Sequence, residues 1–185
     1  GRLLHTAGDR AVEVLVSPPE RPYALSNKEL LALDGQGLDA ILTDISAHLL
    51  ASGRMLATAE SCTGGLIAAA CTDLAGSSQW FERGFVTYSN AAKSELLGIP
   101  AALIEEHGAV SESVARAMAA GAVVNAHAHW SVAVTGVAGP TGGSPEKPVG
   151  TVWFGWATPA GVFTEHRRFD GDRAAVRQAT VDHFL

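Results

Sequence analysis

The stretch TAESCTGG, residues 58–65, gathers several reactive side chains in one short segment. It contains the carboxylate of Glu60, the hydroxyl groups of Ser61 and Thr63, the thiol of Cys62 and two glycines. An apolar run, MLATA, precedes it and a small-residue run, LIAAAC, follows, which predicts a buried strand, a turn and a helix. Backbone N–H groups in a first helical turn have no partners inside the helix, so they can bind an oxyanion beside a nucleophile. Ser61 is therefore a candidate nucleophile.

Two alternatives to this interpretation concern the same turn. Ser61 or Thr63 could simply cap the helix that follows, since both residue types are good N-caps. Cys62 could be the nucleophile instead, although most such cysteines are small buried residues. Gly64 and Gly65 would in either case let a ligand approach the backbone closely.

A second group of candidates lies in the stretch YSNAAKSE, residues 88–95. Asn90 is predicted to cap a helix over 91–97, which places Lys93 on its first turn, near the positive end of the helix dipole. That position and partial burial both tend to lower the pKa of a lysine, and a lysine that is neutral at working pH can serve as a base. Tyr88, at the end of a strand predicted over 81–89, could face the same space. The alternative is a solvated lysine and a half-buried tyrosine.

A third candidate is the glycine-rich stretch TGVAGPTGGS, which begins at Thr135 and Gly136. It is similar to a phosphate-binding loop, but it lacks the Gly-Lys-Ser/Thr ending of a nucleotide-triphosphate loop, so on its own it is a weak indication. His127 and His129 have an H-x-H spacing without an apparent third ligand, so we expect no metal site.

Strands and helices alternate around these candidates. Helices are predicted from Leu38 to Gly53, over 64–74, from Pro100 to Gly108, over 112–126 behind a Ser111 cap, and from Asp172 to the end. Strands are predicted at 131–136 and in a hairpin, TVWFGWAT and GVFTEHRRF, joined at PAG. The order predicts one domain over residues 37–185, a three-layer α/β/α sandwich with a mixed sheet.

Residues 1–36 look different and form a predicted extension of unknown role. AVEVLV, residues 11–16, could be one strand, and SPPERPY is a proline-broken connector.

Composition narrows the class of protein. The net charge of −6 argues against an extended nucleic-acid footprint, so any phosphate must be bound locally. No apolar run approaches the roughly 18 residues of a membrane span, and we expect no membrane partner. Two cysteines in 185 residues make neither a disulfide framework nor a four-ligand zinc site, and the simplest interpretation is a cytoplasmic protein.

Several motifs, taken in order, resemble the CinA C-terminal domain family. They are AESCTGG, GSSQWFERGFVTYSNAAKSELLG, HGAVSE, AVTGVAGPTGGSPEKPVGTVWFGWA and FDGDRAAVRQAT. The resemblance covers about residues 38–185. The resemblance implies an α/β/α fold and deamidation of nicotinamide mononucleotide to nicotinic acid mononucleotide and ammonia. It also implies a homo-oligomer, expected to be a dimer, and no cofactor or metal.

The resemblance further implies a serine–lysine hydrolase site assisted by a tyrosine, which here match Ser61, Lys93 and Tyr88. We then expect backbone amides around Thr63 to Gly65 to hold the oxyanion, and the glycine-rich loop to hold ribose and phosphate. The expected substrate-binding residues are Glu60, Thr63, Gly64, Gly65, Thr135, Gly136, Gly139 and Arg173. Two other functions stay open: a non-catalytic nucleotide-binding or interaction module, and an amidase for a different amide.

Overall fold

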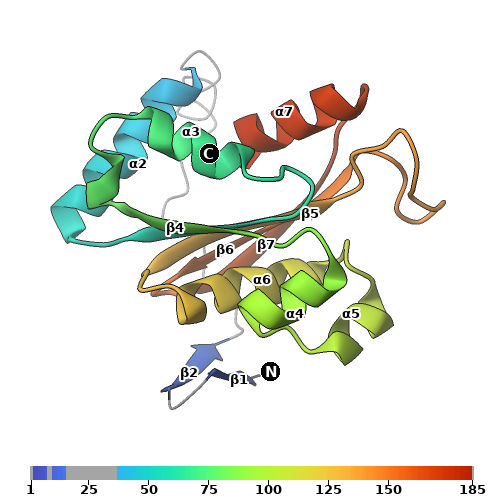
Figure 1. Cartoon of the computed structure of the whole chain (residues 1–185), viewed down its shortest axis with the longest axis horizontal. Helices are drawn as coiled ribbons and strands as arrows, with labels where there is room; N and C mark the ends of the chain where they lie inside the picture. The colour runs from blue at the N-terminus through green and yellow to red at the C-terminus, as the bar shows by residue number, and fades with distance from the viewer. Residues whose placement is uncertain (1, 8–9, 16–36, 185) are drawn as a thin grey trace.

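The main sheet of the protein is mixed. The computed structural model describes residues 2–7, 10–15 and 37–184. Five strands are arranged in the order β4-β3-β5-β6-β7 (Figure 1). The strands are β3 (Leu56–Glu60), β4 (Phe81–Val86), β5 (Trp130–Gly136), β6 (Thr151–Thr158) and β7 (Gly161–Arg168). β3 runs parallel to both β4 and β5, whereas β6 and β7 add antiparallel strands, as predicted.

Helices cover both faces of this sheet and complete the predicted three-layer sandwich (Figure 1). One face carries α2 (Leu38–Ser52), α3 (Leu66–Asp73) and α7 (Arg173–Phe184). The other carries α4 (Asn90–Leu97), α5 (Ala101–His107) and α6 (Glu112–Asn125). A short 3-10 helix, η1 (Ser77–Gln79), precedes β4. Each helical layer buries its own apolar cluster against the sheet.

β3 is the strand that positions the site. It lies between two parallel neighbours, and all five of its residues are buried, which fits its small and apolar sequence LATAE. Because β3, β4 and β5 are parallel, their carboxyl ends meet at one edge of the sheet. Ligands of such sheets bind at that edge.

Most predicted helix boundaries are confirmed. Gly53, in the left-handed conformation, ends α2, and the Ser111 hydroxyl accepts a hydrogen bond from the Val114 amide at the start of α6. One cap was predicted wrongly. The side chain that caps α4 is that of Ser89, which accepts from the Ala92 amide, and Asn90 is already helical.

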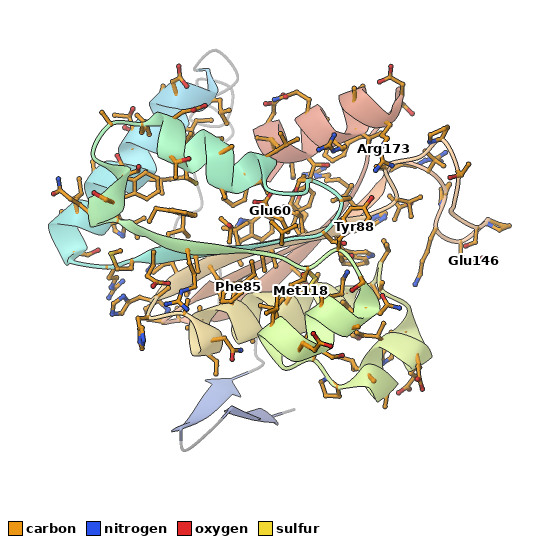
Figure 2. The ribbon with its side chains drawn as sticks, in the orientation of Figure 1. Glu60, Phe85, Tyr88, Met118, Glu146 and Arg173 are labelled. Carbon is orange, nitrogen blue, oxygen red and sulfur yellow. The ribbon has the colours of Figure 1, made fainter. Side chains whose placement is uncertain are left out.

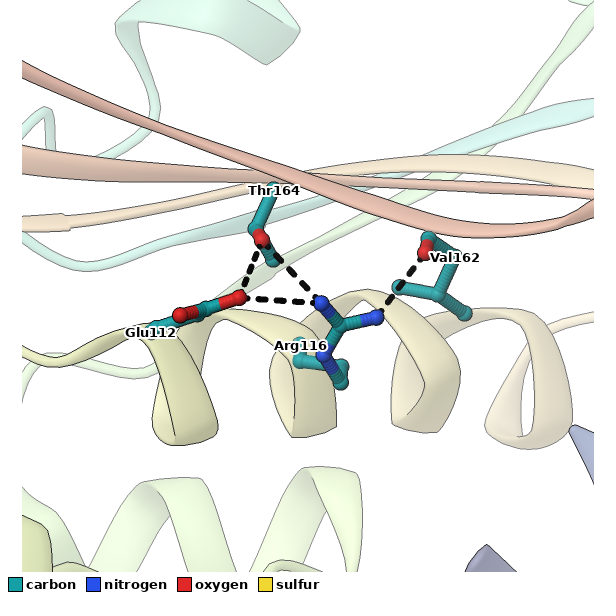
Figure 3. A network of polar contacts seen from close by, with 4 residues as sticks. All are labelled: Glu112, Arg116, Val162 and Thr164. Carbon is teal, nitrogen blue, oxygen red and sulfur yellow. Dashed lines mark hydrogen bonds and ion pairs between the residues drawn. The ribbon is translucent and has the colours of Figure 1, made fainter. Parts of the chain in front are cut away.

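A polar network fastens α6 to the edge strand β7 (Figure 3). The Arg116 guanidinium donates to the Val162 carbonyl at 2.9 Å, to Glu112 at 3.0 Å and to the Thr164 hydroxyl at 3.2 Å. Thr164 also donates to Glu112, and these two hydrogen bonds lower the pKa of the Glu112 carboxyl. The network fixes the start of α6 over the sheet, close to the edge where β3 ends.

The N-terminal extension includes a two-stranded antiparallel hairpin of β1 (Arg2–Ala7) and β2 (Arg10–Leu15). β2 confirms the strand expected at 11–16. The SPPERPY connector lies outside the described residues. In the part of the chain that is described, no helix combines the length and the apolar character needed to cross a membrane.

Candidate active site

A pocket of about 210 Å³ opens at the carboxyl ends of β3 and β5. Residues from five separate segments line it. The lining residues are Ser61, Cys62, Tyr88, Lys93, Ala109, Val110, Thr135, Gly136, Ala138 and Arg173. The pocket therefore brings together all three predicted catalytic residues and three of the predicted binding residues, Thr135, Gly136 and Arg173.

Ser61 and Lys93 form a buried pair although 32 residues separate them in the sequence. Ser61 directly follows β3, and its amide donates to the Val134 carbonyl of β5, which extends the parallel pairing by one residue. The Lys93 Nζ atom lies 3.1 Å from Ser61 Oγ. Lys93 is 1% exposed and Ser61 9%, so the reacting atoms are screened from bulk water.

The surroundings of Lys93 favour its neutral form. Its Nζ atom also lies 2.8 Å from the Thr87 carbonyl and 3.3 Å from the Tyr88 carbonyl. Among the described residues no carboxylate forms an ion pair with it, and burial lowers the pKa of the amine. A neutral amine donates twice and accepts once, so it can donate to both carbonyls and accept the Ser61 proton.

Of the two predicted causes of this pKa shift, the helix N-terminus and partial burial, only burial is confirmed. Because Ser89 caps α4, Lys93 lies a full turn into the helix, and its own amide already donates to the Ser89 carbonyl. Desolvation, rather than the free N-terminus of the helix, lowers the pKa of Lys93.

Glu60 caps α3, so the alternative in which Ser61 or Thr63 caps this helix is wrong. The buried Glu60 carboxylate accepts hydrogen bonds from the Thr63 hydroxyl at 2.6 Å and from the amides of Gly65, Ile67 and Ala68 at 2.9–3.2 Å. No side chain at Ser61 or Thr63 caps α3. Glu60 and Thr63 thus act inside the turn, and neither lines the pocket, so their predicted contact with substrate stays a prediction.

Of the amides of Thr63, Gly64 and Gly65, which were expected to hold the oxyanion, only that of Thr63 is left free by the turn. The Gly64 amide donates to the Ser61 carbonyl and the Gly65 amide to Glu60, so both are already engaged. Within the described chain, the N–H groups of Cys62 and Thr63 donate to no backbone carbonyl, and the Cys62 N–H interacts only with the sulfur of its own side chain. The residue after a nucleophile commonly supplies an oxyanion donor, and Cys62 holds that position here.

Tyr88 and Arg173 lie together at the outer side of the pocket (Figure 2). An Arg173 N–H donates to the Tyr88 hydroxyl at 2.9 Å, and a second donates to the Gly139 carbonyl at 2.8 Å. Since the Tyr88 oxygen accepts from Arg173, its own proton is available to another acceptor. Tyr88 is 58% exposed, in contrast to the buried pair.

The start of the glycine-rich loop forms another wall of the pocket. The Thr135 hydroxyl donates to the Ala109 carbonyl and so joins β5 to the segment before α6. A Cβ atom at Gly136 would lie 2.9 Å from the Thr151 carbonyl and 3.1 Å from the Cys62 sulfur, so a side chain there has no room. Gly139 does not line the pocket, but its carbonyl holds Arg173.

The other sequence candidates do not form a second site. Burial raises the pKa of the Cys62 thiol to about 11, so it is protonated at neutral pH and a poor nucleophile. The His129 ring accepts from the Met55 amide, and the described residues contain no group of metal-ligating side chains around it or His127. Sequence patterns missed Ala109, Val110 and Ala138, since small apolar side chains carry no chemical signature.

The fold and site define a class of protein: a three-layer α/β/α domain with a buried serine–lysine pair in a pocket at the ends of parallel strands. Residues 38–185 match the family model of the CinA C-terminal domain, and the chain belongs to this family.

Relatives in this family share most of the chain. The nicotinamide-nucleotide amidohydrolase PncC of Enterobacter agglomerans is 58% identical over 146 residues, which are 78% of this chain and 89% of the relative. The PncC protein of Escherichia coli K12 is 51% identical over 162 residues, 87% of this chain and 93% of the relative. The crystal structure of competence/damage inducible protein CihA from Agrobacterium tumefaciens has a TM-score of 0.77 and 45% identity, covering 80% of this chain and 90% of that one.

Proposed function

We propose that this chain is an amidohydrolase that converts nicotinamide mononucleotide to nicotinic acid mononucleotide and ammonia. The observation that carries the proposal is the buried Ser61–Lys93 pair, 3.1 Å apart, in a pocket. The names of the 51–58% identical relatives support the choice of substrate. The scheme uses no cofactor or metal, because Ser61 supplies the nucleophile.

Acylation begins with attack of Ser61 Oγ on the carboxamide carbon of the nicotinamide ring. The new C–O bond forms as the carbonyl π electrons move onto oxygen, and the Ser61 proton passes to the Lys93 amine directly or through Tyr88. The N–H of Cys62, which belongs to a pocket-lining residue, is the donor that would stabilise the oxyanion. The C–N bond then breaks, and the leaving amide nitrogen takes the proton from Lys93 to depart as ammonia.

Deacylation repeats the sequence with water. Lys93, neutral again, removes a proton from water as the water oxygen attacks the nicotinoyl ester. The ester C–O bond breaks, Ser61 Oγ recovers its proton, and the acid product leaves. The carbonyls of Thr87 and Tyr88 hold the amine in place through both half-reactions, since they accept from either protonation state.

Substrate binding would use the outer part of the pocket. The Arg173 guanidinium is the cationic group among the outer lining residues, so we assign to it the phosphate, with the ribose against Thr135 and Gly136. A homodimer and a cytoplasmic location also belong to this proposal as predictions.

The experiment that tests the function is direct. Purified protein is incubated with nicotinamide mononucleotide, and ammonia and the acid product are quantified, with nicotinamide riboside and simple nicotinamide as competing substrates. We expect ammonia release to be fastest with the mononucleotide. The Ser61→Ala variant should release none, and a matched control, Ser94→Ala, should release as much as the unsubstituted protein. No ammonia from any amide would indicate a non-catalytic binding module, and a preference for another amide would correct the substrate.

A further inference from the structure

Arg177, one turn after Arg173 on α7, contacts the nucleophile turn from outside the pocket. Its Nε donates to the Cys62 carbonyl at 3.2 Å and its Nη2 to the Thr63 carbonyl at 3.3 Å. The guanidinium is not among the pocket-lining groups, so it does not face substrate. A single side chain of α7 therefore holds two consecutive carbonyls of the segment that carries Ser61.

These contacts bear on the two free amides through the geometry of the peptide group. In a trans peptide, the carbonyl and the N–H of one unit point in opposite directions. Arg177 holds the Cys62 carbonyl, so the Thr63 N–H of the same unit is directed away from α7. The Ser61 carbonyl is held in the same manner by the Gly64 amide, which orients the Cys62 N–H.

Glu60 and Arg177 bind different backbone groups of the turn: Glu60 binds amides, and Arg177 binds carbonyls. Glu60 takes the Gly65 amide and two amides of α3, whereas Arg177 takes the carbonyls of Cys62 and Thr63. The two free N–H groups of Cys62 and Thr63 are what remains. A cation on the carbonyl side also polarises the N–H of the same peptide unit, which strengthens it as a donor.

From this arrangement we infer that Arg177 is a positioning residue for the oxyanion hole. It holds the unit of the Thr63 N–H through the Cys62 carbonyl, and through the Thr63 carbonyl it holds the unit of the Gly64 amide. The Gly64 amide in turn binds the Ser61 carbonyl and so orients the N–H of Cys62, which lines the pocket. The inference rests on the proposed function for its substrate, but it concerns any acyl transfer at Ser61. It assigns different roles to the two arginines of α7: Arg173 lines the pocket, and Arg177 acts through the turn.

The first test separates the chemical step from binding. Arg177→Gln should lower kcat by about 10- to 100-fold, the scale for a misplaced catalytic group, while KM for nicotinamide mononucleotide stays within about 3-fold. Arg177→Lys should recover part of kcat, because an ammonium reaches carbonyls without the two-pronged geometry. The matched control is Arg168→Gln, which removes the same charge from an exposed position on β7. A rise in KM with unchanged kcat would make Arg177 a phosphate anchor and overturn the inference.

A second test does not depend on the amide substrate. A fluorophosphonate probe phosphonylates an activated serine: the serine oxygen bonds to phosphorus and fluoride leaves. The rate of Ser61 labelling therefore reports the Ser61–Lys93 pair and the oxyanion donors together. Arg177→Gln should slow labelling by about 10-fold or more, with the pH midpoint of labelling unchanged, because Lys93 is untouched. A shifted midpoint, or a rate equal to that of the unsubstituted protein, would overturn the inference.

The two tests fail in distinguishable ways. If the unsubstituted protein is labelled at Ser61 but releases no ammonia from nicotinamide mononucleotide, the proposed substrate is wrong and the labelling rates still decide the role of Arg177. Thermal melting is followed for every variant. If Arg177→Gln loses its cooperative transition, Arg177→Lys alone decides: labelling slowed at an unchanged midpoint supports the inference, and labelling at the original rate refutes it.

Discussion

The nucleophile turn, residues 60–65, and the loop that follows β5, residues 137–149, border the same pocket but are built differently. This loop contains the glycine-rich stretch beyond Gly136. In the turn, the Glu60 side chain binds backbone amides and the Arg177 side chain binds backbone carbonyls. Residues 60–63 are buried. The loop is exposed from Pro140 to Glu146. Backbone pairing between Val137 and its neighbours Gly150 and Thr151 holds its base. Farther out, the Arg173 side chain binds the Gly139 carbonyl, and the loop's own Lys147 side chain binds the His107 carbonyl at the end of α5.

The difference shows what each region has to do. An oxyanion hole works only if its donors are in place before charge develops, and the turn is fixed by the buried Glu60 and the partly buried Arg177. A binding loop has to admit and release a ligand, and exposed side-chain anchors allow that. If this division is correct, substitutions at the turn should affect kcat, and substitutions at the loop should affect KM and stability modestly.

The largest effect is expected at Ser61. Ser61→Ala should lower turnover by about 10⁴-fold or more, as for other nucleophiles that act as a unit with their base. The protein should remain folded, because the Ser61 hydroxyl caps no helix. The measurement is ammonia release together with a thermal melt. Retention of near-normal turnover would exclude Ser61 as the nucleophile and return attention to an activated water.

The next effect concerns Lys93 and its protonation. Burial lowers the pKa of this amine, so the base form is populated as pH rises through a value below that of a free lysine. The acylation rate should therefore rise with pH along one ionisation in that lower range. Lys93→Arg should remove the rising limb and lower the rate by about 10²- to 10⁴-fold, since arginine keeps its charge but cannot accept a proton.

Lys93→Met provides the control for this experiment, because it keeps the apolar stem without any charge. It should be as inactive as Lys93→Arg. Substantial activity in the arginine variant alone would show that positive charge, rather than a base, is needed at this position.

The sequence alone predicted most of the elements, because their signals are local. The spacing of Leu38, Leu42 and Leu49, and the Ser111 cap, set the bounds of α2 and α6 to within one or two residues. The cap of α4 was misassigned because Ser89 and Asn90 are adjacent and both are good caps. Where two adjacent residues are equally good caps, the sequence leaves the start of the helix uncertain by one residue.

The candidate site was predicted less completely, and the reason is physical. Ser61, Lys93 and Tyr88 were recognised through their residue types and through a family resemblance. The roles of Glu60 and Arg177 depend on contacts between the turn and helices, and the Arg177 contacts join residues more than 110 positions apart. Likewise, burial of Lys93 depends on how α4 packs, which no local pattern reports.

A smaller effect is expected at Arg173. It tests most sharply whether the turn determines kcat and the loop determines KM. Loss of one charge-assisted contact to phosphate, about 1.5–3 kcal/mol, should raise KM for nicotinamide mononucleotide about 10- to 100-fold in Arg173→Gln. With nicotinamide riboside, which has no phosphate, the same substitution should change KM little.

Arg173 also donates to the Tyr88 hydroxyl, so a second comparison is needed. Tyr88→Phe removes that hydroxyl and leaves the guanidinium in place. A fall in kcat shared by Arg173→Gln and Tyr88→Phe, and equal for riboside and mononucleotide, would mean that Arg173 acts through Tyr88 on the chemical step. Effects on kcat would then not be confined to the nucleophile turn.

The smallest effect is expected at the outer anchor of the loop. The Lys147 ammonium donates to the His107 carbonyl at 2.7 Å, at the C-terminal end of α5, where a cation is favourable. Such an exposed contact contributes about 0.3–1 kcal/mol and is screened by salt. Lys147→Ala should therefore lower the melting temperature by about 1–4 °C at low ionic strength, with less effect at high salt. Lys147→Arg keeps the charge and should melt near the unsubstituted protein. Because the anchor lies outside the pocket lining, kcat should be unchanged in both variants and KM should rise by no more than about 3-fold in Lys147→Ala. A large fall in kcat would show that the loop, like the turn, has to be fixed for the chemical step, and that the two regions differ in exposure only.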